Sequence, residues 1–303
     1  MKGKLVLVIL AIIIFIGTQS CAPSEEQKSK GAEVVKPVAT HIGGCILAFP
    51  AAEAPQNVYQ ETEIIPTDEY KPFTKKKMVY GITLIARDEI SDEFINKVGE
   101  TIKAMFPQEG PGIDLELQQT LLKKLYQYRT VIPLFKGHNY QFTPEEEQLW
   151  EMTRSQNSIC DIIMEGVQGQ VNEVVEHILH HVTDVGFHYT FPDSWGISKN
   201  STLYKVMQTA IEKNYYNITQ YQDIEDNEKL RVLLQEFAYW LIYTSWDLRR
   251  IYGPFEAEWA IMTLDELKSL LPEGYQLFNT TVPKVMVAPP RELLEQLKKF
   301  EAK

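Results

Sequence analysis

Two kinds of hydrophobic pattern divide this chain into expected strands and expected helices. Apolar and β-branched residues run together at 78–86 and 130–135, which predicts two strands, and a shorter run at 45–49 predicts another. Elsewhere the apolar positions recur every three or four residues, as on one face of a helix. This spacing predicts helices over residues 92–106, 115–126, 171–185, 202–213 and 229–250. The pattern indicates a helix-rich α+β protein with a small sheet.

Polar residues mark the start of the first of these helices and predict two more, after Thr143 and after Thr263. Ser91 has the position of an N-cap, and Thr143 is followed by Pro144 and three acidic residues, which suits the first turn of a helix. Thr263 and Glu266 have the spacing of a capping box.

The first twenty residues have the pattern of a secretory signal peptide. Lys2 and Lys4 precede an unbroken apolar run at residues 5–16, and small polar residues follow it. This run is shorter than the roughly 20 residues that a membrane-spanning helix needs. We therefore expect residues 1–20 to be removed and the protein to be exported, with a single short membrane anchor as the alternative.

Cys21 follows this apolar segment directly and resembles the lipidated cysteine of a bacterial lipobox, although Thr18 stands where that pattern has leucine. Lipidation would attach the protein to a membrane; the alternative is ordinary cleavage that leaves the cysteine unmodified. Residues 21–77 are rich in proline and poor in periodicity. We expect them to form a tether and an irregular segment, with the folded domain over residues 78–303.

The composition narrows the function class. Hydrophobic residues make up 44% of the chain and charged residues 23%, as in ordinary globular proteins. The formal net charge of -11 repels phosphate, so we expect no nucleic-acid partner. Cys45 and Cys160 would be able to pair in an oxidising compartment, but the sequence leaves this open, and a buried free thiol at Cys160 is the alternative.

The helix expected at residues 171–185 carries two stripes of side chains. One stripe is apolar and indicates a buried face. The other is formed by Glu173, Glu176, His177, His180, His181 and Asp184, which also step by three and four residues. Three of the six histidines in the chain therefore lie within five residues of one another.

Side chains one helical turn apart project together, and zinc peptidases use this by placing His-Glu-x-x-His on a helix. Here the candidate pairs are His177 with His181, Glu176 with His180, and Glu173 with His177. The alternative is a polar helix face that contacts only water or other protein groups.

A further ligand would come from another segment. Glu236 is the best candidate, because it lies inside the apolar and aromatic helix expected at residues 229–250, where an unpaired carboxylate is costly. The alternative is a position at the helix edge, bonded to a tyrosine or an arginine.

These two helices together resemble the gluzincin branch of the zincin-like metallopeptidases. The segments that begin at Glu176 and at Glu236 are also similar to an uncharacterised family of secreted proteins, which has a Glu-Glu-x-x-His-x-x-Thr-x-x-Gly helix and a later Glu-Tyr-Phe-Tyr-Trp helix. By that resemblance Glu176, His180 and Glu236 hold the family's positions, and His177 replaces its second glutamate. The resemblance covers roughly residues 171–271 and implies a zincin-like fold with a two-helix active-site core.

The expected function is hydrolysis of a peptide bond in a peptide or protein substrate through zinc-bound water. We expect His177, His180 and Glu236 as zinc ligands, with His181 as a substitute for His180. Among the carboxylates, Glu176 is the favoured base and Glu173 the second. The alternative is a non-catalytic binding or scaffold lipoprotein of the cell envelope, with the same fold.

Overall fold

The computed structural model describes residues 40–138 and 140–302, which belong to one compact unit that extends from Val38 to Lys303. The expected signal peptide and Cys21 lie outside the described residues. Among the described helices, none has the length and apolar character needed to cross a membrane.

A five-stranded mixed sheet forms the β part of the fold. Its strands are hydrogen-bonded in chain order, β3 (Ile65–Pro66), β4 (Lys75–Val79), β5 (Ile82–Ala86), β6 (Thr130–Lys136) and β7 (Ile163–Glu165). The pairs β3–β4 and β4–β5 are antiparallel, whereas β5–β6 and β6–β7 are parallel. The short β7 is an edge strand that the hydrophobic pattern did not indicate.

The apolar run at residues 78–86 is two strands rather than the one expected. Tyr80 and Gly81 form a tight turn between β4 and β5, with φ angles of 51° and 90°. Two consecutive positive φ values are typical of the two-residue turns that match the twist of an antiparallel hairpin. A Cβ atom at Gly81 would lie 2.8 Å from the Tyr126 ring, so glycine also fits the space.

Apolar side chains cover both faces of the sheet. Along β6, Val131 and Phe135 contribute to one small core, and Ile132 and Leu134 contribute to the main core. This alternation follows from the two-residue period of a strand. The helix α3 (Pro144–Ser155) packs on the smaller core through Trp150.

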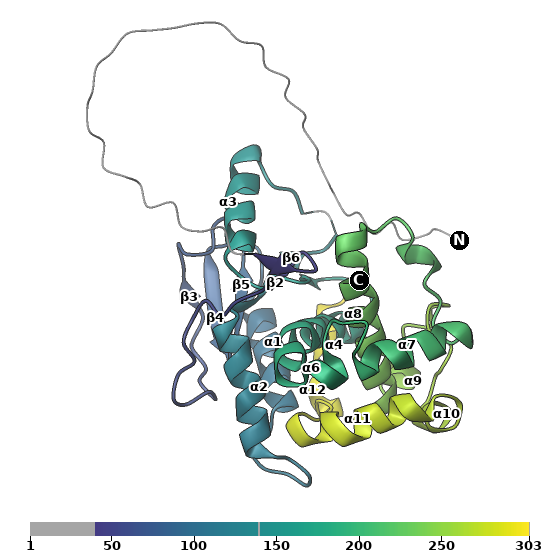
Figure 1. Cartoon of the computed structure of the whole chain (residues 1–303). Helices are drawn as coiled ribbons and strands as arrows, with labels where there is room; N and C mark the ends of the chain where they lie inside the picture. Colours follow the sequence, from purple (N-terminus) through teal and green to yellow (C-terminus); the bar gives the residue numbers. More distant parts are fainter. Residues whose placement is uncertain (1–39, 139, 303) are drawn as a thin grey trace, which may run out of the picture. The chain divides into compact units, whose positions relative to one another are not determined.

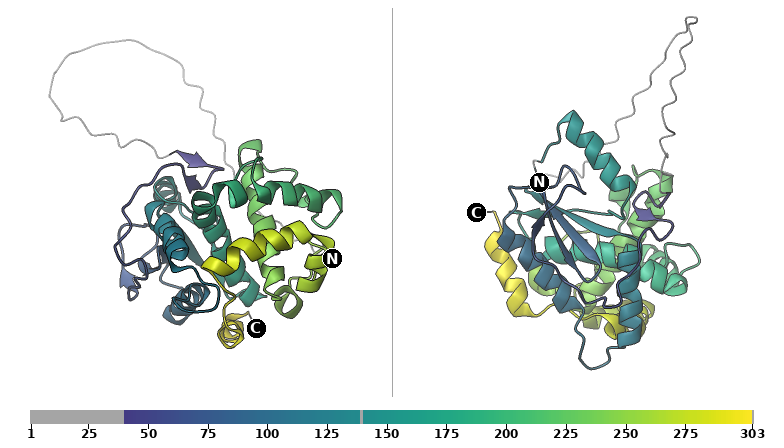
Figure 2. Two further views of the ribbon diagram at one scale, coloured as in Figure 1. Left: turned by 60° about the horizontal axis from the view of Figure 1, so that its bottom comes forward. Right: turned by 90° about the vertical axis from the view of Figure 1, so that its left-hand side faces the viewer.

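The other helices gather around the main core. Those nearest the sheet and the candidate site are α1 (Asp92–Met105), α2 (Leu115–Gln127), α4 (Gln170–His181) and α8 (Asp226–Ser245). The rest are α5 (His188–Thr190), α6 (Pro192–Trp195), α7 (Thr202–Glu212), α9 (Arg249–Tyr252), α10 (Leu264–Leu270), α11 (Pro272–Val285) and α12 (Arg291–Leu297). Figure 2 shows the C-terminal helices, in yellow, lying against other helices.

The expected helix starts are confirmed. Ser91 caps α1, because its side chain accepts a hydrogen bond from the Phe94 amide. Thr143 and Thr263 each form a complete capping box. A helix-rich α+β class with a small sheet is likewise confirmed.

Residues 40–77 are part of the folded unit, whereas the sequence led us to expect its start near Met78. A hairpin of β1 (His41–Ile42) and β2 (Ile46–Leu47) packs against the rest of the unit, with β2 buried and β1 half-buried. Cys45, directly before β2, forms a disulfide with Cys160. This bond resolves the question that the sequence left open.

Candidate metal centre

The candidate site lies between α4 and α8, which pack side by side (Figure 1). The apolar stripe of α4 is buried as expected, so the helix presents its polar stripe toward α8 and toward the segment before β7. After His181 the helix continues as a π-helical turn over Val182–Phe187. Such turns occur frequently at functional sites.

Three donor groups from the two helices converge. Glu176 and His180 on α4 and Glu236 on α8 offer ligand atoms that all lie within 4.8 Å of one another. The Nε2 atom of His180 lies 3.6 Å from Oε2 of Glu236. Two ligands of a tetrahedral zinc ion lie about 3.4 Å apart when each bond is about 2.0–2.1 Å long. This group could therefore hold a metal ion with little movement.

The ring of His180 is oriented by a carboxylate from another segment. Its Nδ1 atom donates a hydrogen bond to Oδ2 of Asp161, at 2.8 Å, which leaves Nε2 facing Glu236. The Nε2 atom is buried and has no hydrogen-bond partner among the described residues. A metal-binding histidine commonly donates its second ring N–H to a carboxylate in this way, since the bond fixes the ring and the tautomer.

The carboxylate of Glu176 is also held in place. The side-chain amide of Asn172 donates to its Oε2 atom at 2.6 Å, and the Tyr239 hydroxyl donates to Oδ1 of the same asparagine. Asn172 lies one turn before Glu176 on α4, and Tyr239 lies on α8. The two helices therefore together hold Glu176 in place.

His177 lies outside this group of three and faces two other carboxylates. Its Nε2 atom is 3.7 Å from Asp161, and its Nδ1 atom is 3.2 Å from Oε1 of Glu173. Burial acts to lower the pKa of His177, but the charges of Asp161 and Glu173 outweigh it and raise the pKa to about 10. His177 is therefore a largely buried imidazolium at neutral pH, with 13% of its side chain exposed. Asp161, His177 and His180 form a second group with metal-compatible spacing, but hydrogen bonding already joins Asp161 to His180.

Glu173 is used in the packing of α4 against the sheet. Its Oε1 atom accepts a hydrogen bond from the backbone N–H of Met164 in β7, at 2.7 Å. The same oxygen faces His177. This carboxylate belongs to none of the three groups of residues with metal-compatible spacing in the described chain.

The structure brings His181 into neither group. Its Nδ1 atom donates to the carbonyl oxygen of His177 at 2.7 Å, and its Nε2 atom accepts from the backbone N–H groups of Cys160 and Asp161 at 3.3 and 3.4 Å. Burial lowers the pKa of His181 to about 4, so the ring is neutral. Both ring nitrogens are thus engaged by the backbone.

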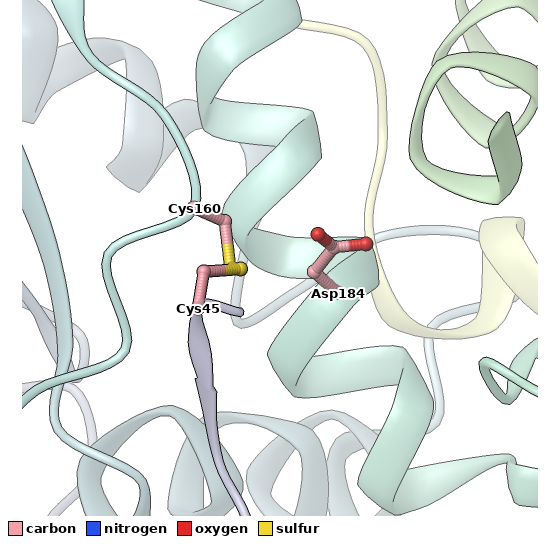
Figure 3. Close-up of side chains that lie close together, drawn as sticks. All are labelled: Cys45, Cys160 and Asp184. Carbon is pink, nitrogen blue, oxygen red and sulfur yellow. A yellow bond between two sulfur atoms is a disulfide. The ribbon is translucent and has the colours of Figure 1, made fainter. Parts of the chain in front are cut away.

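Cys45, Cys160 and Asp184 also lie close together (Figure 3). The two sulfur atoms are bonded to each other, so neither is a thiolate ligand. Asp184 is buried, and its Oδ2 atom lies 3.3 Å from the guanidinium of Arg231 on α8. This acid is the last member of the polar stripe, and it forms an ion pair instead of joining the site.

When no cation is bound, protons on Glu176 and His180 offset the negative charge of the carboxylates in the site. Burial raises the pKa of Glu176 to about 8, with a further contribution from the charge of Glu236. Although burial acts to lower it, the pKa of His180 is raised well above its ordinary value by Glu236 and Asp161. Ligands must lose their protons to bind a metal, so a metal ion would compete directly with these protons.

The sequence did not indicate the supporting residues Asp161, Asn172, Tyr239 and Gln235, the last of which places its side-chain nitrogen 3.0 Å from Nδ1 of His180. The sequence could have indicated that Asn172 contacts Glu176, because the two residues lie one turn apart on the same helix. It held no such indication for Asp161, since this residue reaches His180 from an irregular segment. Comparison of the chain with protein-family models, curated proteins and solved structures found no match.

Proposed function

We propose that this protein is an exported, zincin-like zinc metallopeptidase whose zinc ligands are Glu176, His180 and Glu236. The observation that carries the proposal is the orientation of His180, whose buried Nε2 atom faces Glu236 while Asp161 holds Nδ1. A helix that offers two donors one turn apart, with a third donor from a second helix, supports the zincin-like assignment.

Two residues of α4 thereby take roles other than those the sequence led us to expect. Glu176 becomes a ligand rather than the base, because it groups with His180 and Glu236 and is anchored by Asn172. His177 takes no part in binding the ion. A bound zinc ion would supply the Lewis acid for hydrolysis of a peptide bond. The ring of His177 lies 5.5 Å from that of His180, and its Nε2 atom, 3.7 Å from Asp161, is beyond hydrogen-bond distance of that carboxylate. The Nε2–H of this imidazolium would donate a hydrogen bond to the oxygen on which negative charge develops.

The same proposal includes export and attachment through a lipid at Cys21. The sequence pattern of residues 1–21 supports it, and a disulfide is typical of proteins outside the reducing cytosol. Mass spectrometry of the protein isolated from its native host would test it. We expect a mature chain that begins at a diacylglyceryl-modified Cys21; an unmodified cysteine or an intact leader would contradict lipidation.

A non-catalytic binding or scaffold protein is the second candidate function. The observation that favours it is the pairing of His177 with Asp161 and Glu173, because an imidazolium is a poor general base. Glu173 is likewise engaged by the backbone of β7. Under this candidate the site would hold a metal ion for stability or for binding a partner, without turnover.

Metal analysis of the full-length chain tests the shared part of both candidates. The protein would be purified without a metal-binding tag, supplied with zinc, dialysed, and examined by inductively coupled plasma mass spectrometry. We expect about one zinc per chain, lost in His180→Ala and Glu236→Gln but retained in Glu212→Gln, whose carboxylate is exposed on α7. Absence of zinc from the unaltered protein would overturn the proposed metal site.

A peptide-library assay then separates the two candidates. We expect the zinc-loaded protein to cleave peptides, and His177→Gln to lower kcat by at least about tenfold while zinc content is unchanged. A zinc-loaded protein that cleaves no peptide would favour the binding or scaffold function. Equal kcat in the His177 variant would show that this imidazolium has no role in the reaction.

A further inference from the structure

The disulfide is connected to the candidate metal centre through the backbone next to it. Cys160 directly precedes Asp161, the residue that orients His180. The backbone N–H groups of these two residues both donate to His181 on α4. The position of the Asp161 carboxylate therefore depends on where this short segment lies against α4.

The N-terminal hairpin holds the same segment from its other side. The Ile159 N–H donates to the carbonyl of Cys45 at 3.2 Å, and the Leu47 N–H donates to the Ser158 hydroxyl at 3.0 Å. The disulfide adds a covalent link one residue farther along, at Cys160. The segment is thus fixed between the hairpin and α4.

The hairpin is in turn attached to the helix that carries Glu236. The carbonyl of Gly43 accepts a hydrogen bond from Nε of Arg231 on α8, at 2.6 Å. A Cβ atom at Gly43 would lie 2.6 Å from Cβ of Arg231, and its φ of 55° also favours glycine. Arg231 pairs with Asp184, which lies beside the disulfide (Figure 3). The disulfide therefore completes a connected path from α8, through the hairpin, to Asp161.

We propose that the Cys45–Cys160 disulfide is a positioning element of the metal site, which increases metal affinity by fixing Asp161. This inference rests on the proposed metal site at Glu176, His180 and Glu236. Opening the disulfide leaves the segment before β7 held by hydrogen bonds alone, so Asp161 fixes the orientation of the His180 ring less firmly. Because coupling between two sites is reciprocal, metal binding in turn stabilises the closed disulfide.

A double-mutant cycle in the full-length chain tests this coupling with zinc as the probe. The zinc Kd would be measured by chelator competition for the unaltered protein, C45S/C160S, D161N and the triple variant. Serine avoids the new zinc ligands that reduced thiols would provide. We expect C45S/C160S and D161N each to raise Kd about 10–100-fold, as for other residues that orient a metal ligand. The triple variant is expected to resemble D161N, because both changes act through one carboxylate.

The positioning role would be overturned if the increases in Kd of C45S/C160S and of D161N multiply in the triple variant. An unchanged Kd in C45S/C160S would overturn it too. These outcomes differ from failure of the proposed metal site, in which the unaltered protein with its disulfide intact binds no zinc. Circular dichroism of each variant would establish that it is folded before its Kd is interpreted.

A second measurement uses the native disulfide and applies even where the serine variant does not fold. A water-soluble phosphine reduces the bond; Cys45 and Cys160 each gain a proton, and the phosphine becomes its oxide with oxygen from water. We expect saturating zinc to slow reduction severalfold in the unaltered protein and to have little effect in D161N. Equal rates with and without zinc in the unaltered protein would contradict the coupling.

Discussion

The hydroxyl of Tyr239 on α8 donates a hydrogen bond to the side-chain carbonyl of Asn172 on α4, at 2.5 Å. The side-chain amide of Asn172 in turn donates a hydrogen bond to Oε2 of Glu176. The tyrosine is fully buried, so its hydroxyl has exchanged water for this one partner. The bond therefore links the packing of the two helices to the position of a proposed metal ligand.

Tyr239→Phe is expected to lower the free energy of unfolding by about 1–3 kcal/mol, because it leaves the Asn172 carbonyl without its donor. Tyr243 is a matched control, one turn farther along α8. It is equally buried, but its hydroxyl has no partner among the described residues. Tyr243→Phe should therefore leave stability unchanged or raise it. Chemical denaturation of both variants measures this, and equal losses would show that the Asn172 bond has no special role.

The polar stripe of α4 could be predicted because it depends only on local periodicity. Spacings of three and four residues placed Glu176 and His180 together, and the apolar residues between them are buried. The unusual carboxylate in an aromatic helix likewise pointed to Glu236. For these residues the helix itself sets the direction of the side chains.

Other features depended on contacts between distant segments. His181 has helical spacing suitable for a ligand, yet the backbone of residues 160 and 161 engages its ring. Asp161 approaches from an irregular segment, where no periodic pattern fixes the direction of a side chain. The turn at Tyr80 and Gly81 divides an apolar run whose composition alone resembled one strand. The sequence therefore indicated the donor residues better than their partners.

Zinc is expected to stabilise the folded protein measurably. A ligand that binds only the folded state at 100 times its Kd adds about 2.7 kcal/mol to the free energy of unfolding. Thermal unfolding with zinc and then with excess chelator should show a reversible rise and fall in Tm. Glu236→Gln should abolish the zinc-dependent rise, and Glu212→Gln should retain it. A rise that persists in Glu236→Gln would place the stabilising ion elsewhere.

Arg231 forms a buried ion pair with Asp184 and also binds the hairpin at Gly43, so its loss should destabilise the protein. Arg231→Met should lower the free energy of unfolding by about 3–5 kcal/mol, because it leaves a buried carboxylate unpaired. The double variant Arg231→Met with Asp184→Leu should recover a substantial part of this loss, since neither charge remains. Urea denaturation would measure both. If the double variant is no more stable than the single one, the lost bond to Gly43 is the main cause.

Glu258 forms a buried acidic site near α8. Its carboxylate accepts hydrogen bonds from Tyr221, Trp240 and Gln220, at 2.6, 3.0 and 2.6 Å. Burial raises the pKa of Glu258 to about 7, with a further contribution from the charge of Glu236. The folded state therefore binds this proton more tightly than the unfolded chain does.

Because of this raised pKa, the contribution of Glu258 to the free energy of unfolding falls as pH rises. The contribution of Glu258 is fully present below about pH 4.5 and is lost progressively as the pH approaches 7, because the folded state must then bury a charge. A difference of about 2.5 pKa units corresponds to about 3 kcal/mol.

Glu258→Gln removes the titrating group and keeps an acceptor for Tyr221 and Trp240. Its free energy of unfolding relative to the unaltered protein should therefore increase between pH 4.5 and pH 8, with metal excluded by chelator. A constant difference between the two proteins across this range would show that Glu258 titrates alike in the folded and unfolded states.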